Sequence, residues 1–126
     1  MIVLDTSVLI NGLTGLQRSG AAIRGSIAEG EVVSIPSLVL YEWLRGPRLP
    51  EEVAAQEALF PASSAIPFGP EEAIVSAELY RTVRRPRGRE IDLGIAACAM
   101  VRGAQLWTLN AADFRDLPGL LLYPAR

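Results

Sequence analysis

The chain has 126 residues, and half of them are hydrophobic, which favours a folded chain of about one domain over a disordered one. It contains no His, no Lys and a single Cys, so His-based catalytic triads, Lys-dependent phosphate loops and Cys-rich metal cages are excluded. A formal net charge of −2 gives no overall basic field that would attract nucleic acid. The chemistry that remains must use carboxylates, hydroxyls, Arg side chains and a metal ion.

The N-terminal residues and the cysteine usage predict a cytoplasmic protein. Residues 1–5 contain no basic residue of a secretion signal, and no apolar span of about 18 residues occurs in the sequence. Cys98 has no partner for an internal disulfide, which fits a reducing compartment. Because no repeat or linker divides the sequence, we expect one soluble domain over residues 1–126, without membrane contact.

The first half of the chain alternates short apolar runs with helical segments. Residues 2–4 predict a buried strand, and Thr6 or Ser7 is expected to cap a helix that continues to Leu13. Further along, the pattern predicts a helix over 21–29, a strand over 32–35, helices over 36–44 and 51–59, and a weak edge strand over 65–67.

The second half predicts two longer helices and two more strands. The first helix runs from about residue 70 to 84 and the second from 91 to 101, with strands over 106–109 and 120–123. Strands that are apolar on both faces and alternate with helices predict a parallel sheet covered on both sides. Ligands of such sheets bind beyond the carboxyl ends of the strands, where Asp5 and Asn110 each directly follow a predicted strand.

Four carboxylates stand out from the other acids because they follow strands or interrupt apolar runs: Asp5, Glu42, Asp92 and Asp113. Each also has a structural explanation, since Asp5 and Asp113 suit a helix or turn cap, Glu42 can pair with Arg45, and Asp92 can favour a helix N-terminus. Each structural explanation suits its own residue, but together they account less well for four acids that all follow strands or interrupt apolar runs. Asp116 is expected to lie on ordinary surface. Six other acids are expected on solvent-facing stretches of helix: Glu51, Glu52, Glu57, Glu71, Glu72 and Glu78.

A cluster of carboxylates needs a cation or protons to persist. Two charges about 4 Å apart repel by roughly 4 kcal/mol at an effective dielectric constant of 20. Without His or a second Cys, an all-oxygen site suits Mg²⁺ or Mn²⁺ and not Zn²⁺. A hard metal held by carboxylates is a common means of cleaving phosphodiesters, because it activates water and stabilises charge on the phosphate.

Four short motifs, in order and spread over nearly the whole chain, carry a resemblance to a known family. They are Leu4-Asp5-Thr6-Ser7, Glu42 on a helix after Ser34-Ile35-Pro36-Ser37, Ile91-Asp92-Leu93-Gly94-Ile95-Ala96-Ala97, and Thr108-Leu109-Asn110-Ala111-Ala112-Asp113-Phe114 with Pro118-Gly119-Leu120. Together they resemble the PIN-domain nucleases and, more narrowly, the VapC-type ribonuclease toxins of bacterial toxin–antitoxin pairs. The resemblance implies an α/β fold, a three-layer α/β/α sandwich around a central parallel sheet of about five strands. It also implies Mg²⁺ or Mn²⁺, cleavage of tRNA or ribosomal RNA, a cognate antitoxin that blocks the site, and a homodimer.

The resemblance assigns a role to each matching residue. Asp5 and Asp92 match the principal metal-holding acids, and Glu42 matches an acid on a helix that would hold the metal or orient its water. The family's last acid stands where this chain has either Asn110 or Asp113. Because the first is an amide, we assign the charge to Asp113 and a supporting hydrogen bond to Asn110. Hydroxyls that would orient the carboxylates belong to Thr6, Ser7 and Thr108.

Two surfaces would serve the partners that the resemblance implies. An Arg-rich segment precedes Asp92, and we expect its Arg85, Arg87 and Arg89 to contact substrate phosphates. The alternative is a solvated helix end with favourable cations. An apolar groove for the antitoxin would include Leu13, Leu16, Trp43, Leu44 and Leu49, although such residues more often belong to the core.

The leading hypothesis is therefore a metal-dependent endoribonuclease that acts as a toxin. Two alternatives stay open: a PIN nuclease of RNA processing that is no toxin, and a non-catalytic PIN-like scaffold that binds RNA or protein.

Overall fold

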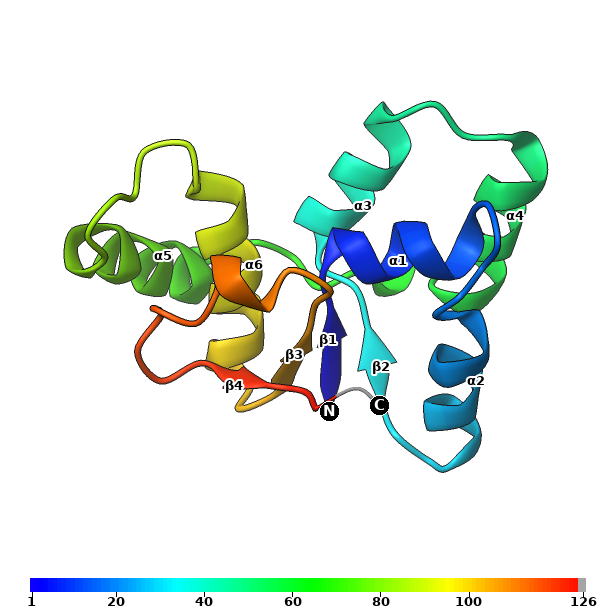
Figure 1. Cartoon of the computed structure of the whole chain (residues 1–126). Coiled ribbons are helices and arrows are strands. Elements are labelled where there is room, and N and C mark those ends of the chain that lie inside the picture. The colour runs from blue at the N-terminus through cyan, green and yellow to red at the C-terminus, as the bar shows by residue number, and fades with distance from the viewer. Residues whose placement is uncertain (125–126) are drawn as a thin grey trace.

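The computed structural model describes residues 1–124, which form a parallel sheet flanked by helices (Figure 1). The sheet has four strands in the order β2-β1-β3-β4, and all neighbouring pairs are parallel. In chain order the strands are β1 (Ile2–Leu4), β2 (Val33–Ser34), β3 (Gln105–Trp107) and β4 (Leu121–Leu122). This confirms the α/β architecture, with one strand fewer than expected.

Six α-helices connect the strands within the described part of the chain: α1 (Thr6–Leu13), α2 (Gly20–Ala28), α3 (Ser37–Arg45), α4 (Pro50–Leu59), α5 (Pro70–Thr82) and α6 (Glu90–Val101). Two short 3₁₀ turns cover Ala62–Ser64 and Ala111–Asp113. Helices α5 and α6 pack together at the β3–β4 end of the sheet, whereas α1, α2 and α4 gather at the β2 end (Figure 1). No helix among residues 1–124 is both long and apolar enough to span a membrane.

The missing strand is the edge strand expected over residues 65–67. Ile66 forms a single bridge with Pro36, in which it donates its N–H to the Ile35 carbonyl (2.9 Å) and accepts from the Ser37 N–H (2.8 Å). The ladder ends there because α3 begins at Ser37 and the 3₁₀ turn Ala62–Ser64 lies just before Ile66. The prediction of a fifth strand was wrong because hydrophobicity alone did not show that these neighbouring helical turns leave room for only one bridge.

Strand β1 is the centre of the sheet and fixes the position of the residue that follows it. All three of its side chains are fully buried, and it pairs with β2 on one edge and β3 on the other. The Asp5 N–H continues the pairing by donating to the Trp107 carbonyl at 2.9 Å. Asp5 therefore lies at the carboxyl edge of the sheet, between its two middle strands, as expected.

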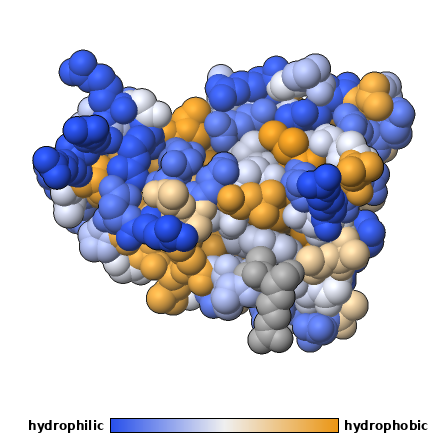
Figure 2. Space-filling model, in the orientation of Figure 1, coloured by the Kyte–Doolittle hydropathy of each residue, from blue (hydrophilic) through white to orange (hydrophobic). Residues whose placement is uncertain are grey.

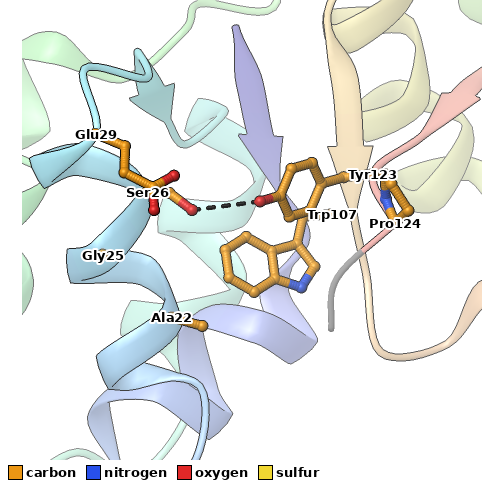
Figure 3. Close-up of a pocket in the computed structure, with 7 residues that line it drawn as sticks. All are labelled: Ala22, Gly25, Ser26, Glu29, Trp107, Tyr123 and Pro124. Carbon is orange, nitrogen blue, oxygen red and sulfur yellow. Dashed lines mark hydrogen bonds between the residues drawn. The ribbon is translucent and has the colours of Figure 1, made fainter.

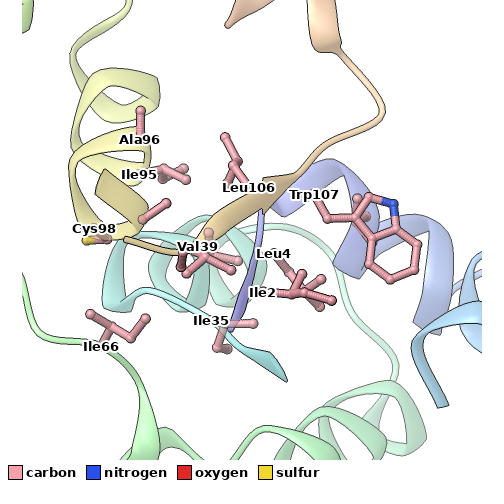
Figure 4. Close-up of a cluster of buried hydrophobic side chains, with 14 of the residues drawn as sticks. Ile2, Leu4, Ile35, Val39, Ile66, Ile95, Ala96, Cys98, Leu106 and Trp107 are labelled. Carbon is pink, nitrogen blue, oxygen red and sulfur yellow. The ribbon is translucent and has the colours of Figure 1, made fainter. Parts of the chain in front are cut away.

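Helix α6 is the most deeply buried helix, with every residue from 93 to 99 buried. Small side chains allow this close packing: a Cβ placed on Gly94 would lie 2.6 Å from Leu38 Cδ1 of α3. Ile95 points towards Leu106 of β3 (Figure 4), and both Ile95 and Ala96 belong to the buried cluster that includes the side chains of β1 and β3. The first turn of α6, which carries Asp92, is thereby held beside α3, which carries Glu42.

The expected apolar groove is only partly on the surface. Leu13 and Trp43 are buried in the core, so for these two residues the structure supports the more ordinary alternative. Leu16, Leu44 and Leu49 are exposed, so only these three of the five residues are available to a partner.

Candidate active site

Asp5 is buried at the start of α1, with 5% of its surface exposed. It occupies the position before the helix, yet its side chain makes no capping hydrogen bond. Instead, Oδ2 accepts hydrogen bonds from Ser7 Oγ (2.8 Å) and Thr108 Oγ1 (2.7 Å). The structural explanation of Asp5 as a helix cap is thus not supported, and neither Thr6 nor Ser7 caps α1 as expected.

The two hydroxyls that hold Asp5 are themselves held by the backbone after β3. The Leu109 N–H donates to Ser7 Oγ and the Asn110 N–H donates to Thr108 Oγ1, both at 3.0 Å. Asp5 is therefore oriented by a network that joins two segments a hundred residues apart in the sequence. For Asn110 the bond comes from its main chain, and the structure gives its side chain no bond to the acids.

Glu42 lies on α3 and faces the start of α1. Its Oε1 accepts a hydrogen bond from Thr6 Oγ1 at 2.5 Å, and its Oε2 lies 3.3 Å from an Arg45 nitrogen. The ion pair with Arg45, expected as the structural alternative, is present, and the bond to Thr6 joins Glu42 to the segment that carries Asp5. Glu42 and Asp92 line the same cavity of about 440 Å³, together with Arg45 and Gly88.

Asp92 shows that the four acids share one electrostatic environment. Its pKa is raised from 3.8 to about 6, first by burial and then by the negative charges of Asp5, Glu42 and Asp113. The Arg89 guanidinium lowers the pKa of Asp92, and its effect is the smallest of these. A carboxyl whose ionisation is opposed by burial and by the charges of other carboxylates marks a functional-site candidate. Asp5, Glu42 and Asp113 are therefore near enough to Asp92 for their charges to act on it.

Arg89 and Asp116 form a structural clamp that sequence reasoning missed. Arg89 donates to both carboxylate oxygens of Asp116 (2.8 and 2.7 Å) and to the main-chain oxygen of Asp113 (2.8 Å). This bidentate pair raises the pKa of Arg89 and lowers the pKa of Asp116. It ties the exposed Asp113 turn to the start of α6. Asp116 is therefore more than ordinary surface, although no local pattern links residues 27 positions apart.

The other predicted phosphate contacts lie on the loop between α5 and α6. Arg85 and Arg87 are exposed, and the surface over this loop is hydrophilic (Figure 2). Arg89, by contrast, already donates three hydrogen bonds within the protein. Arg85 and Arg87 are thus the freer candidates for phosphate contact, and the role of all three stays a prediction.

The donors around the acids are all oxygens, which suits a hard cation such as Mg²⁺ or Mn²⁺. Over residues 1–124, however, no three side chains of the His, Cys, Asp and Glu types are grouped closely enough to hold a metal ion. Both Glu42 oxygens are held by Thr6 and Arg45, and one Asp5 oxygen is held by hydroxyls. The chemistry of the donors fits a divalent metal, and the ligand assignment stays a prediction.

A second cavity, of about 440 Å³, lies between α2 and the ends of β3 and β4 (Figure 3). Trp107 and Tyr123 pack against each other at its wall, with ring centroids 5.0 Å apart and ring planes tilted by 43°, and Ser26 lies 3.4 Å from the Tyr123 hydroxyl. None of the predicted site residues lines this cavity. The acids and their hydroxyls therefore remain the candidate active site.

Comparison with known proteins tests the family resemblance. Residues 2–120 match the PIN domain family. The chain is 33% identical over 122 residues to Ribonuclease VapC19 of Mycobacterium tuberculosis, an alignment that covers 95% of this chain and 97% of that protein. These matches confirm the resemblance to PIN domains and VapC-type ribonucleases that the motifs predicted.

Solved structures agree in fold. A DNA-bound VapBC from Salmonella typhimurium has a TM-score of 0.75 and 24% identity, and covers 97% of this chain and 96% of that one. VapBC2 from Rickettsia felis, bound to a DNA fragment from its promoter, has a TM-score of 0.73 and 21% identity, and covers 98% of both chains. At this level of identity the likeness shows the fold alone.

Proposed function

The chain belongs to the PIN-domain family, and on this premise we propose that it is a metal-dependent endoribonuclease, the toxin of a type II toxin–antitoxin pair. The observation that supports this most directly is the pKa of Asp92, which burial raises most and the charges of Asp5, Glu42 and Asp113 raise further, to about 6. Four acids from separate parts of the chain are costly to gather, and a cation removes that cost. The name of the relative in Mycobacterium tuberculosis, a ribonuclease, supports RNA as the substrate.

The proposed ligands are Asp5, Glu42, Asp92 and Asp113. Mg²⁺ or Mn²⁺ bound there would supply an activated water and positive charge for the phosphate oxygens. The chain's other residues would prepare this reaction: Ser7 and Thr108 keep the Asp5 carboxylate in one orientation by donating hydrogen bonds to Oδ2. Thr6 does the same for Glu42.

The substrate would be held by charge as well as by the acids. Arg85 and Arg87, with Arg89 behind them, lie just before α6, and cations there would attract the RNA backbone that the net charge of −2 does not. We propose tRNA or ribosomal RNA as the substrate, cut within an accessible loop. Asn110 would support the fourth ligand position beside Asp113.

We also propose two protein partners. The similar structures from Salmonella typhimurium and Rickettsia felis are VapBC proteins, and a neighbour from Klebsiella pneumoniae is a toxin–antitoxin complex. We infer that a cognate antitoxin binds this chain and blocks its acids, and that the chain forms a homodimer. The exposed Leu44 and Leu49, near α3, are candidate contacts for the antitoxin.

Inducible expression of the wild type and of Asp5→Asn, with recovery of RNA and mapping of new 5′ ends, tests this function. We expect growth arrest and a small set of cut sites with the wild type only, and relief of both by the co-expressed antitoxin. Cut sites without growth arrest would favour a nuclease of RNA processing. Absence of any new end would favour a non-catalytic scaffold.

A further inference from the structure

A groove of about 520 Å³ begins beside the Asp5 network and runs along α1. Ser7, Asn11 and Thr14 line it, together with Ile10, because their spacing places them on one face of the helix. At about 1.5 Å of rise per residue, the groove extends roughly 10 Å away from Ser7. Ser7 lines the groove and also donates a hydrogen bond to Asp5 at 2.8 Å, so one end of the groove adjoins the Asp5 network.

The walls of the groove combine apolar surface with amide groups. Leu16 and Leu109 are 79% and 49% exposed, and both line it. The Asn11 Oδ1 accepts a hydrogen bond from Ser19 Oγ at 2.6 Å, which fixes the direction of the amide and leaves its Nδ2 hydrogens for a ligand. Asn110 lines the wall nearest to the acids.

At the far end of the groove, the turn after α1 places the polar residues Gln17 and Arg18 in its lining. Gln17 has a φ of 51°, a left-handed conformation that residues other than Gly seldom adopt. Its N–H donates to the Thr14 carbonyl at 3.0 Å, which closes the turn after α1. The next residue, Arg18, lines the groove, is exposed and forms no ion pair among residues 1–124.

We propose that this groove binds one unpaired nucleotide of the RNA, next to the phosphate that is cut. This inference rests on the proposed function and names the part of the substrate that the acids do not touch. The base would lie against Leu16 and Leu109, the amides would bond its edges, and Arg18 would contact the following phosphate. A paired base cannot enter without leaving its stack, so the groove selects single-stranded RNA.

The chemistry of the lining also predicts base selectivity. No aromatic side chain lines the groove, so the sequence-tolerant stacking typical of single-strand binding is not available. Hydrogen bonds from Asn11, Gln17 and Asn110 depend on which donors and acceptors the base presents. A purely apolar protein segment would leave these amides and Arg18 unmatched, which favours a nucleotide as the occupant.

Cleavage of a pool of short unstructured RNAs, randomised in sequence, tests this proposal. The wild type should show a preferred base at one position beside the cut, and Asn11→Ala should reduce that preference about tenfold. Leu109→Ala should raise KM with little change in kcat, because it removes binding surface and leaves the acids intact. Thermal unfolding of each variant identifies a fold defect, since Asn11→Ala also removes the acceptor of Ser19.

Arg18→Gln against Arg24→Gln provides a matched pair that keeps the proposal testable if Asn11→Ala fails to fold. Both residues are exposed, and only Arg18 lines the groove. In an Asp5→Asn background, Arg18→Gln should lower the slope of log affinity against log salt by about 0.7 for these RNAs, and Arg24→Gln should not. Equal salt slopes for Arg18→Gln and Arg24→Gln, together with an unchanged base preference in Asn11→Ala, would overturn the proposal that the groove binds a nucleotide. Cleavage by the wild type would still uphold the proposed function in that case. Loss of antitoxin binding with unchanged RNA cleavage would also overturn the nucleotide proposal, and would assign the groove to a protein segment.

Discussion

Asp92 is the residue at which stability and the proposed chemistry oppose each other. Its folded-state pKa of about 6 lies above the ordinary 3.8, so the folded protein binds more protons than the unfolded chain between these values. Stability without metal therefore falls as the pH rises from about 4 to 6. A functional carboxylate that lowers stability is expected where its neighbours are also acids.

Asp92→Asn should stabilise the metal-free protein while it abolishes cleavage. Because Asp92 is partly exposed and solvent screens its charge, we expect a gain of about 1 kcal/mol in the free energy of unfolding at neutral pH. Thermal unfolding in EDTA measures this gain, which should shrink towards pH 4, where the wild-type carboxyl is protonated.

Asp116→Asn is the matched control for this prediction. The same substitution there removes a carboxylate whose pKa is lowered by Arg89, so it should be neutral or slightly destabilising at neutral pH. A stabilising Asp116→Asn, or a destabilising Asp92→Asn, would contradict the electrostatic account of the acids.

Thr108 acts as a positioning residue in this account. Thr108→Val keeps the shape of the side chain but removes the donor to Asp5 Oδ2 and the acceptor of the Asn110 N–H. We expect kcat for RNA cleavage to fall by about 10- to 100-fold, as on removal of a group that orients a metal ligand, with KM nearly unchanged. Thr82→Val, whose hydroxyl bonds only to the Glu78 carbonyl on the exposed end of α5, should leave kcat unaltered. A rise in KM alone would show that Thr108 serves binding and not orientation.

At the scale of the elements, the start of α5 and the end of α6 are joined by Glu72. This residue is 5% exposed and accepts hydrogen bonds from the Gly69 N–H and from Arg102, both at 2.9 Å. The bond with Arg102 is the main reason that the pKa of Glu72 is lowered. Its contribution to stability is therefore present above the ordinary pKa of 4.5 and is lost as the pH falls through the lower folded-state value.

Glu72→Ala should destabilise the fold by about 2 kcal/mol, because it leaves a helix N–H and a partly buried guanidinium without their acceptor. Glu71→Ala, at the neighbouring exposed position, should change stability by less than about 0.5 kcal/mol. Chemical denaturation of both variants at neutral pH gives the comparison. Equal effects would mean that the Glu72 contacts contribute nothing beyond those of a surface acid.

The sequence could predict those elements whose signal is local. The apolar run over residues 2–4 and its terminal Asp5 predicted both a buried strand and the crevice, because parallel strands end at one edge. Glu72 was wrongly expected to face solvent, since the identity of Arg102 as its partner depends on how α5 packs against α6. Trp43 was ambiguous for the same reason: an apolar helix shows which residues are hydrophobic, but packing decides which side of it is covered.

At the scale of the whole molecule, the site is assembled from contacts that are distant along the chain. Asp5 and Thr108 are 103 positions apart, and Arg89 and Asp116 are 27 apart. The first pair was expected because the family resemblance implied that the Thr108 hydroxyl would orient the carboxylates. The second was not, since neither residue follows a strand or interrupts an apolar run. The composition had excluded catalysis by His or Lys and metal cages of Cys. The fold places Asp5, Glu42 and Asp113 where their charges act on Asp92.

The central claim, that these acids form a metal-dependent ribonuclease site, is tested most directly with purified protein and single-stranded RNA. We predict defined cleavage products with Mg²⁺ or Mn²⁺, loss of cleavage in EDTA with recovery when the metal is restored, and no cleavage by folded Asp5→Asn under any of these conditions. The same products in EDTA, or from Asp5→Asn, would contradict it.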